Sequence, residues 1–218
     1  MSNSVHHLLK RCMSVGVSTW SDALDSSGLA SVMTGLQQRS GSQRFAGFAV
    51  TARETAGDVG MFERREFGIG SIIAAVNAGE VLVIDLGGAP VSTMGGLAAL
   101  AAKKRAAAAV IIDGGCRDVE EIQATGLWVA SRYVTPVTGK TRLRLEGINL
   151  PVQVGGVQVR PGDLIAGDPT GLVAVPRSEL ERVLAKAEQM LATDRIMERE
   201  MEAGSSFAEA AAKADYIR

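Results

Sequence analysis

The chain has 218 residues, of which 46% are hydrophobic and 22% charged, and this balance excludes a disordered or fibrous protein. Lysine and arginine total 23 against 24 acidic residues, so the net charge of -1 disfavours nucleic acid as a partner. Two cysteines, an N-terminus unlike a signal peptide and interrupted apolar stretches predict a cytoplasmic protein with no disulfide framework and no membrane partner.

The first part of the chain alternates predicted helices and strands. The predicted helices lie at 5–14, 18–25, 69–77 and 94–105. The predicted strands lie at 45–52, 80–86 and 108–113, and the Ser-, Gly- and Gln-rich stretch 26–41 is expected to be irregular. Strand–helix–strand units of this kind predict parallel strands covered by helices.

The second part of the chain changes to consecutive short strands joined by glycine-rich turns. These strands are predicted at 127–130, 152–154, 157–159, 164–167 and 172–175. A long, charged helix from Pro176 to about Met201 and a last helix capped by Ser206 follow. We therefore predict one mixed α/β domain over 1–218, with a C-terminal helical arm at about 177–218 that packs on a neighbouring subunit.

Several motifs in the chain mimic known sites without their full pattern. Gly139-Lys140-Thr141 copies the end of a phosphate-binding loop, but Val134 stands where that motif needs a glycine, so a lysine-bearing loop is the better interpretation. The two histidines, His6 and His7, lie near the N-terminus on a predicted helix and are expected on the surface.

A glycine pair begins the predicted helix that follows the strand at 80–86. Gly95 and Gly96, with Leu97 and Ala98 after them, place backbone N–H groups at the positive end of that helix. Such a helix start can bind a carboxylate or a developing oxyanion. The alternative, which these residues leave open, is that the glycines only permit a turn and close packing.

A second candidate lies where the strand at 108–113 ends in Gly114-Gly115-Cys116-Arg117-Asp118. Arg117 could bind a substrate carboxylate in bidentate fashion, while Asp118 could bind a hard divalent cation. The alternative makes Asp118 the cap of a short helix, in a capping box with Glu121, and Arg117 a surface charge. Both candidates follow buried strands, where ligand sites of α/β proteins usually lie, and together they offer what a metal-bound keto acid needs.

These residues resemble the family of 4-hydroxy-4-methyl-2-oxoglutarate aldolases, which also contains the regulator of ribonuclease activity A. The resemblance spans nearly the whole chain. It rests on the segments Ser21–Asp25, Gly79–Asp85, Gly95–Ala98, Asp113–Asp118, Pro151–Asp163 and Gly171–Pro176.

The resemblance implies a mixed α/β sandwich similar to the swivelling phosphohistidine domain, assembled as a homotrimer or hexamer with sites between subunits. It implies that Arg117 binds and polarises the keto acid, that Asp118 holds Mg²⁺ or Mn²⁺, and that the amides of Leu97 and Ala98 hold the pyruvoyl group. Two positions depart from the family pattern. Gly96 stands where an acidic residue is usual, and Asp194 takes the place of a glutamate that reaches the neighbouring subunit's site.

The leading hypothesis is therefore a lyase: a class II pyruvate aldolase that cleaves a 4-hydroxy-2-oxo acid, with oxaloacetate decarboxylation as a side activity. One alternative is a non-catalytic regulator that binds a ribonuclease or another protein. Another is a lyase or dehydratase for a different sugar-derived acid, which the missing carboxylate at Gly96 motivates.

Overall fold

The structure, a computed structural model, describes residues 3–216. Its helices are α1 (Asn3–Ser14), α2 (Val17–Asp25), the 3-10 helix η1 (Arg64–Glu66), α3 (Ile69–Ala75), α4 (Gly96–Lys104), α5 (Val119–Thr125), α6 (Leu180–Glu202) and α7 (Phe207–Ala214). Its strands are β1 (Val32–Met33), β2 (Gln37–Ser40), β3 (Phe45–Ala56), β4 (Val81–Asp85), β5 (Ser92–Met94), β6 (Ala109–Cys116), β7 (Trp128–Val134), β8 (Leu143–Ile148), β9 (Val152–Val154), β10 (Val157–Val159), β11 (Leu164–Asp168) and β12 (Gly171–Val175).

One mixed sheet organises the described residues. Its strand order is β1-β12-β11-β3-β4-β6-β7-β2, with β5 beside β6 and β8 beside β3, while β9 and β10 form a separate hairpin. The central strands β3, β4, β6 and β7 run parallel, so their carboxyl ends meet at one edge. β4 and β6 are buried on both faces, which explains their unbroken apolar runs.

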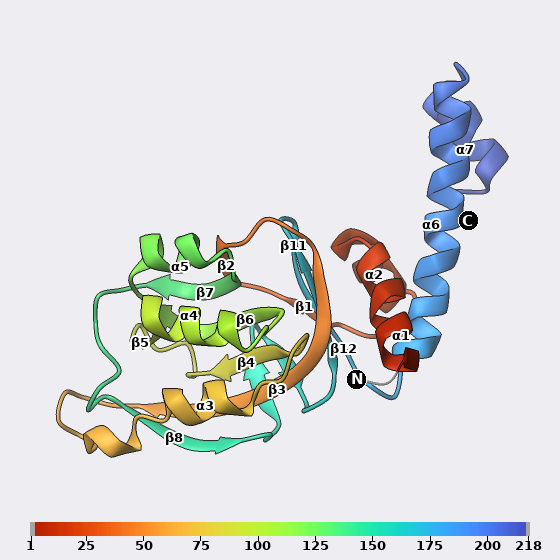
Figure 1. The fold of residues 1–218 in the computed structure, drawn as a ribbon. Coiled ribbons are helices and arrows are strands. Elements are labelled where there is room, and N and C mark those ends of the chain that lie inside the picture. Colours follow the sequence, from red (N-terminus) through yellow and green to blue (C-terminus); the bar gives the residue numbers. More distant parts are fainter. Residues whose placement is uncertain (1–2, 217–218) are drawn as a thin grey trace.

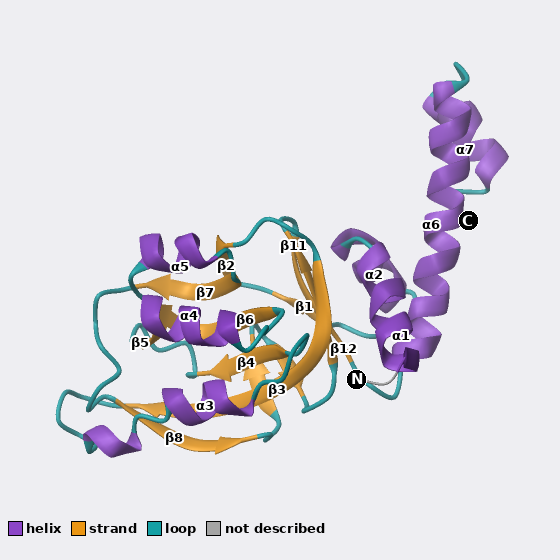
Figure 2. Cartoon of the chain, in the orientation of Figure 1, coloured by secondary structure: helices purple, strands orange, loops and turns teal. Residues whose placement is uncertain are grey.

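The two faces of the central strands have different covers. Helices α3, α4 and α5 lie over one face, against residues such as Leu82 and Ile112 (Figures 1 and 2). On the other face, Val83 and Ile111 pack against the β9–β10 hairpin and against β11 and β12. The long strand β3 connects the two parts of the sheet, because its first residues pair with β11. The outer side of β11 and β12 is covered by α1, α2 and the first turns of α6. This arrangement confirms the predicted mixed α/β sandwich.

Two predictions about individual elements were wrong, and one strand was missed. The stretch 26–41 contains two short strands, β1 and β2, which exist because β12 and β7 provide partners for them. Met94 belongs to strand β5 and not to the helix, which begins at Gly96. Strand β8 was missed, although Leu143 and Leu145 alternate there with charged residues.

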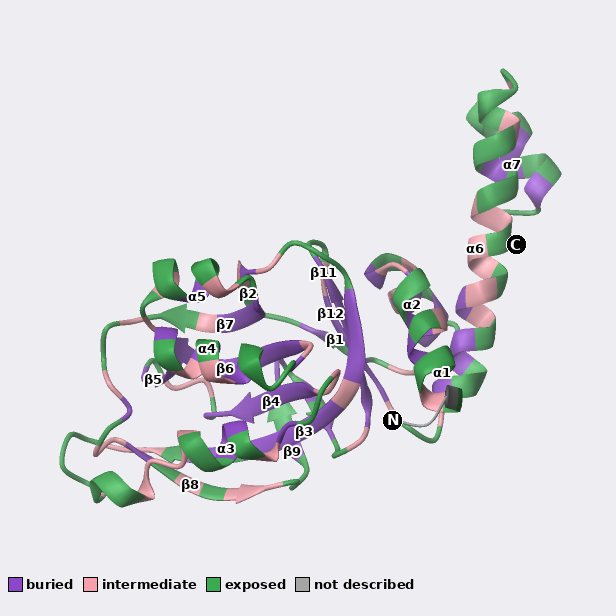
Figure 3. Cartoon of the chain, in the orientation of Figure 1, coloured by how far each residue is buried: buried purple, intermediate pink, exposed green. Residues whose placement is uncertain are grey.

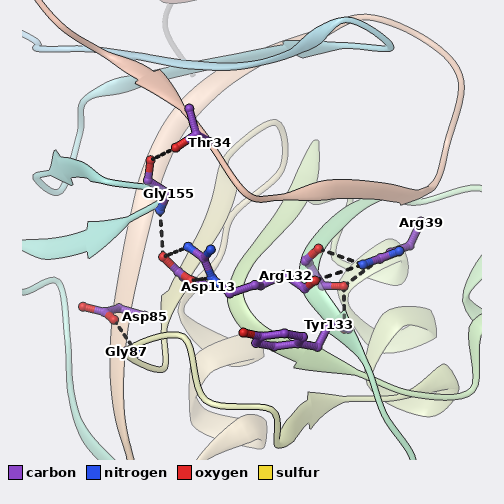
Figure 4. Close-up of polar contacts among 9 residues, drawn as sticks. Thr34, Arg39, Asp85, Gly87, Asp113, Arg132, Tyr133 and Gly155 are labelled. Carbon is purple, nitrogen blue, oxygen red and sulfur yellow. Dashed lines mark hydrogen bonds and ion pairs between the residues drawn. The ribbon is translucent and has the colours of Figure 1, made fainter.

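Two aspartates at the ends of neighbouring parallel strands anchor the β9–β10 hairpin (Figure 4). Asp113 forms a bidentate pair with Arg132, at 2.5 Å to Nε and 3.1 Å to Nη2, and accepts a hydrogen bond of 2.7 Å from the Gly155 amide. Asp85 accepts hydrogen bonds from the amides of Gly87 and Gln153, at 2.8 and 3.0 Å. Their acceptor atoms are engaged by the fold, which assigns these carboxylates a structural role.

Helices α6 and α7 form the predicted arm. The start of α6 packs on α2 through Val183, Leu184 and Ala187, and its distal part contacts α7 through Met197. Beyond these contacts the arm extends from the body with mostly exposed residues (Figure 3). None of the helices within residues 3–216 combines the length and apolarity needed to cross a bilayer.

Candidate functional site

A cavity of about 320 Å³ opens at the carboxyl edge of the parallel strands. Residues of α3, β5, the start of α4, the turn after β6 and the segment before β8 line it. Both predicted loops contribute to it, through Gly95, Leu97, Ala98, Arg117 and Asp118. We name it the Arg117 cavity.

The glycine loop brings the start of α4 to this cavity. Gly95 is extended, with φ -129°, and no side chain caps the helix that begins at Gly96. Helix geometry leaves the amides of Leu97 and Ala98 without acceptors inside the helix, at its positive end. A Cβ on Gly95 would lie 2.3 Å from Asp118 Oδ2, so glycine is needed here for close approach of the two loops.

The backbone at Asp118 is left-handed, with φ 54° and ψ 50°. It turns the carboxylate away from α5 and toward the glycine loop, where Oδ2 lies 3.5 Å from Arg117 Nε and accepts a 3.3 Å hydrogen bond from the Gly96 amide. Helix α5 does start where predicted, but the Asp118 side chain does not cap it, so the predicted capping box with Glu121 was wrong. The carboxylate serves the two-loop junction instead.

Arg117 is tied to the cavity through its backbone as well. Its amide donates a 3.0 Å hydrogen bond to the carbonyl of Met94, the residue before the glycine loop. The side chains of Arg117 and Asp118 remain 38% and 42% exposed, so both are accessible to a ligand. The pair therefore combines a fixed backbone with available polar atoms.

Gly96, the position without the usual acid, is closely covered by Glu121. A Cβ on Gly96 would lie 2.5 Å from Glu121 Cβ, so no side chain fits there unless α5 moves. Glu121 comes from the first turn of α5 and borders a second cavity, of about 480 Å³, together with Asp118 and Gly96. Sequence reasoning treated Glu121 only as a capping residue and so missed this carboxylate beside the site.

Lys140 is a second residue that sequence reasoning missed. The segment Gly139-Lys140-Thr141 is a loop, as predicted, yet Lys140 and Thr138 line the Arg117 cavity. A bridge between Ser92 and Thr138 holds this loop against β5. The alternation of Leu143 and Leu145 could have revealed β8, and with it the loop that precedes the strand.

A buried carboxyl lies near the cavity, in β3. Glu54 is only 4% exposed, and burial raises its pKa to about 7, while the Thr93 hydroxyl acts in the opposite direction. Thr93 itself lines the Arg117 cavity. Glu54 was not predicted, because it stands in a charged stretch that looks exposed in the sequence.

Asp194 is not brought to the Arg117 cavity within one chain. It lies in the arm helix α6, which extends on the opposite side of the molecule from α4 and α5 (Figure 1). Among residues 3–216, no group of three or more His, Cys, Asp or Glu side chains clusters as a ready metal centre.

Comparisons with known proteins identify the family and the fold of the chain. The profile of the RraA-like family, described as Aldolase/RraA, matches residues 17–174, the part of the chain before the arm. A relative from Halalkalibacterium halodurans, named "Putative 4-hydroxy-4-methyl-2-oxoglutarate aldolase", is 31% identical over 180 residues, which cover 82% of this chain and 81% of the relative.

Two solved structures share the fold. An uncharacterized protein from Pseudomonas syringae superposes with a TM-score of 0.83 at 24% identity, covering 94% of this chain and 96% of that one. Streptomyces coelicolor RraAS2, described as an unusual member of the RNase ES inhibitor RraA protein family, gives 0.76 at 23% identity, with 91% and 96% covered. The family profile covers most of the chain and the fold agrees with it, so the chain belongs to the RraA-like family.

Proposed function

We propose that this chain is a divalent-metal-dependent pyruvate lyase of the aldolase type, acting on a 4-hydroxy-2-oxo acid such as 4-hydroxy-4-methyl-2-oxoglutarate. Oxaloacetate decarboxylation is the proposed side activity, because both reactions pass through the enolate of pyruvate. The observation that carries the proposal is the left-handed turn at Asp118, which gathers a guanidinium, a carboxylate and the open start of α4 around one cavity.

The two loops divide the binding of the pyruvoyl group. The amides of Leu97 and Ala98, at the positive end of α4, suit its carboxylate. Arg117 suits the keto oxygen, where its N–H groups donate hydrogen bonds and its charge polarises the carbonyl. Neither role needs a broad basic surface, which agrees with the net charge of -1.

In the cleavage, the bond between C3 and C4 of the substrate breaks as the 4-hydroxyl group loses its proton and becomes a carbonyl. The electron pair of that bond moves into the pyruvoyl group, where Arg117 stabilises the negative enolate oxygen. C3 then takes up a proton, and pyruvate leaves. We assign the transfer of the hydroxyl proton to Asp194. Because α6 extends away from the cavity of its own chain, this Asp194 would come from a neighbouring subunit.

The residues at the cavity fit a hard divalent cation such as Mg²⁺ or Mn²⁺. Mg²⁺ usually binds through one or two carboxylates and keeps several waters, so the lack of a larger ligand cluster does not conflict with it. Asp118, half-exposed beside Glu121, would hold the ion. A bound cation would supply further stabilisation of negative charge on the keto oxygen.

The test is pyruvate release from 4-hydroxy-2-oxo acids and from oxaloacetate with Mg²⁺ or Mn²⁺. Asp118→Asn is the sharp variant, because asparagine also tolerates the left-handed backbone and only the charge is lost. We expect Asp118→Asn and Arg117→Lys to lower kcat/KM by roughly 100-fold or more. Glu120→Gln changes an exposed carboxylate in the first turn of α5. It is the matched control and should behave as wild type.

Equal pyruvate release by all variants would refute the site assignment. If the wild type turned over only other, sugar-derived acids, the site assignment would stand and the proposed substrate would be wrong. No metal-dependent turnover of any of these acids by the wild type would refute the lyase proposal and favour a regulator that binds a protein partner.

A further inference from the structure

The buried carboxyl of Glu54 lies behind the Arg117 cavity and has no charged partner. Neither of its carboxylate oxygens, nor the hydroxyl of Thr93, is satisfied by a well-formed hydrogen bond within residues 3–216. The two residues are 4% and 2% exposed, and the Thr93 hydroxyl is the polar group that acts on Glu54. Burying a carboxyl group without a partner costs folding free energy. Such groups are concentrated at functional sites, which points to a role for Glu54.

The ionisable side chains of the elements around Glu54 pair with other residues or lie at the surface. Arg53, the preceding residue, faces Asp85 at 3.9 Å, and in β8 the Arg144–Glu146 pair closes at 2.9 Å. The charged side chains of η1 lie at the surface or partly exposed, and α3 and β5 carry no ionisable side chain. None of these groups acts on Glu54, so a structural ion pair does not explain its presence.

Strand β5 connects this carboxyl to both loops of the site. Thr93 is the middle residue of β5 and lines the cavity. The next residue, Met94, accepts hydrogen bonds through its carbonyl from the Arg117 amide at 3.0 Å and from the Ser92 hydroxyl at 2.9 Å. The glycine loop follows directly. A change at Thr93 is therefore transmitted to Arg117 and to the start of α4 through three residues of backbone.

We propose that Glu54 is a positioning residue of the Arg117 cavity, acting through the Thr93 hydroxyl on strand β5. Neutral Glu54 donates its O–H to the Thr93 oxygen, which keeps β5 packed in place. Ionised Glu54 can only accept, so the hydrogen bond reverses, and the desolvated charge favours a looser β5 that admits water. The keto-acid site is then best ordered when Glu54 is protonated.

The role of Glu54 rests on the proposed function only in the test that uses pyruvate as the ligand. The first test therefore uses no ligand. Amide NMR signals of Thr93, Gly95 and Arg117 should titrate together near neutral pH in the wild type and stay constant in Glu54→Gln. Signals that titrate equally in Glu54→Gln, or do not titrate in the wild type, would overturn the inference whatever the protein catalyses.

The second test is calorimetric binding of pyruvate with Mg²⁺ across the same pH range. The wild-type Kd should rise by about fivefold as pH increases and β5 loosens, a change of the size of one hydrogen bond's net contribution. Glu54→Gln should keep the tight Kd throughout, Thr93→Ser should retain the pH dependence, and Thr93→Val should flatten it. Glu120→Gln is the control.

A pH dependence that survives in Thr93→Val would show that Thr93 does not transmit the effect, and would overturn the inference. Absence of pyruvate binding by the wild type at every pH would count against the proposed function alone, because the ligand-free titration still decides the role of Glu54.

Discussion

Glu54 gives the protein a pH-dependent stability with an unusual direction. Its pKa of about 7 in the folded protein exceeds the value of 4.5 expected for an exposed glutamate, so the folded state binds this proton more tightly than the unfolded chain. The stabilisation is complete below the unfolded pKa and is lost as pH rises through the folded one. Over that window it amounts to about 3 kcal/mol.

We therefore expect Glu54→Gln, which is neutral at every pH, to be more stable than the wild type at pH 8 and to lose much of this advantage at pH 5. Urea unfolding at the two pH values measures the difference, with Glu120→Gln as the control. A constant difference between the wild type and Glu54→Gln would show that Glu54 does not titrate in this range.

Gly96 is held as glycine by packing. A side chain there would overlap Glu121, whose Cβ would lie 2.5 Å from the new Cβ. We expect Gly96→Asp to lower the free energy of unfolding by about 1–3 kcal/mol, and the added change Glu121→Gly, which removes the overlapping Cβ, to restore part of it. Thermal unfolding of the single and double variants measures this coupling, and equal stability of Gly96→Asp and wild type would contradict it.

Of the residues at the candidate site, the sequence predicted those that directly follow buried strands. It did not predict those that only tertiary packing brings to the cavity. Arg117 and Asp118 could be named because strand ends and glycine turns have local signatures. Glu54 and Lys140 have no such signature. The first stands among charged residues and is buried beside β5 and β8. The second reaches the cavity because its loop is held between the Ser92–Thr138 bridge and the start of β8.

Among the elements, the β9–β10 hairpin depends on the carboxylates at the ends of β4 and β6. Asp113 makes three of the contacts, two to Arg132 and one to the Gly155 amide. We expect Asp113→Ala to cost about 2–3 kcal/mol, because it removes charge-assisted hydrogen bonds and leaves Arg132 unpaired. Hydrogen exchange should show faster exchange at Gly155, whereas the surface variant Glu146→Gln should leave this amide unchanged. Unaltered exchange in Asp113→Ala would refute the anchor.

The predicted elements agree best with the structure where the residues of the segment itself, and not its partners, specify the helix or strand. The apolar runs of β4 and β6 and the capping box of Ser206 and Glu209 at α7 were predicted and are present. Strands β1 and β2 have two and four residues and lack a clear alternation, so only their partners define them. Short strands of this kind are products of tertiary pairing.

At the scale of the whole molecule, the arm separates one proposed catalytic residue from the rest of the site. Asp194 lies on α6, away from the cavity that holds Arg117. An assembly in which the arm of one copy reaches the cavity of another reconciles the two positions. In such an assembly each site would contain residues of two chains.

This arrangement predicts complementation between two inactive proteins. Arg117→Ala and Asp194→Ala should each be inactive alone, and subunits exchanged between them should recover part of the pyruvate release, since some mixed sites contain both native residues. Activity assays before and after denaturation and joint refolding measure the recovery. Failure to recover activity in verified mixed assemblies would place both residues in the same chain's site, or remove Asp194 from the reaction.

The left-handed backbone at Asp118 has a consequence for how this fold could diversify. Among ordinary residues only glycine, asparagine and aspartate adopt that conformation at low cost. Two of these three keep the turn while removing the carboxylate. A single substitution at this position can therefore remove the carboxylate of the proposed site and keep the turn, which leaves the fold available for selection on a binding role.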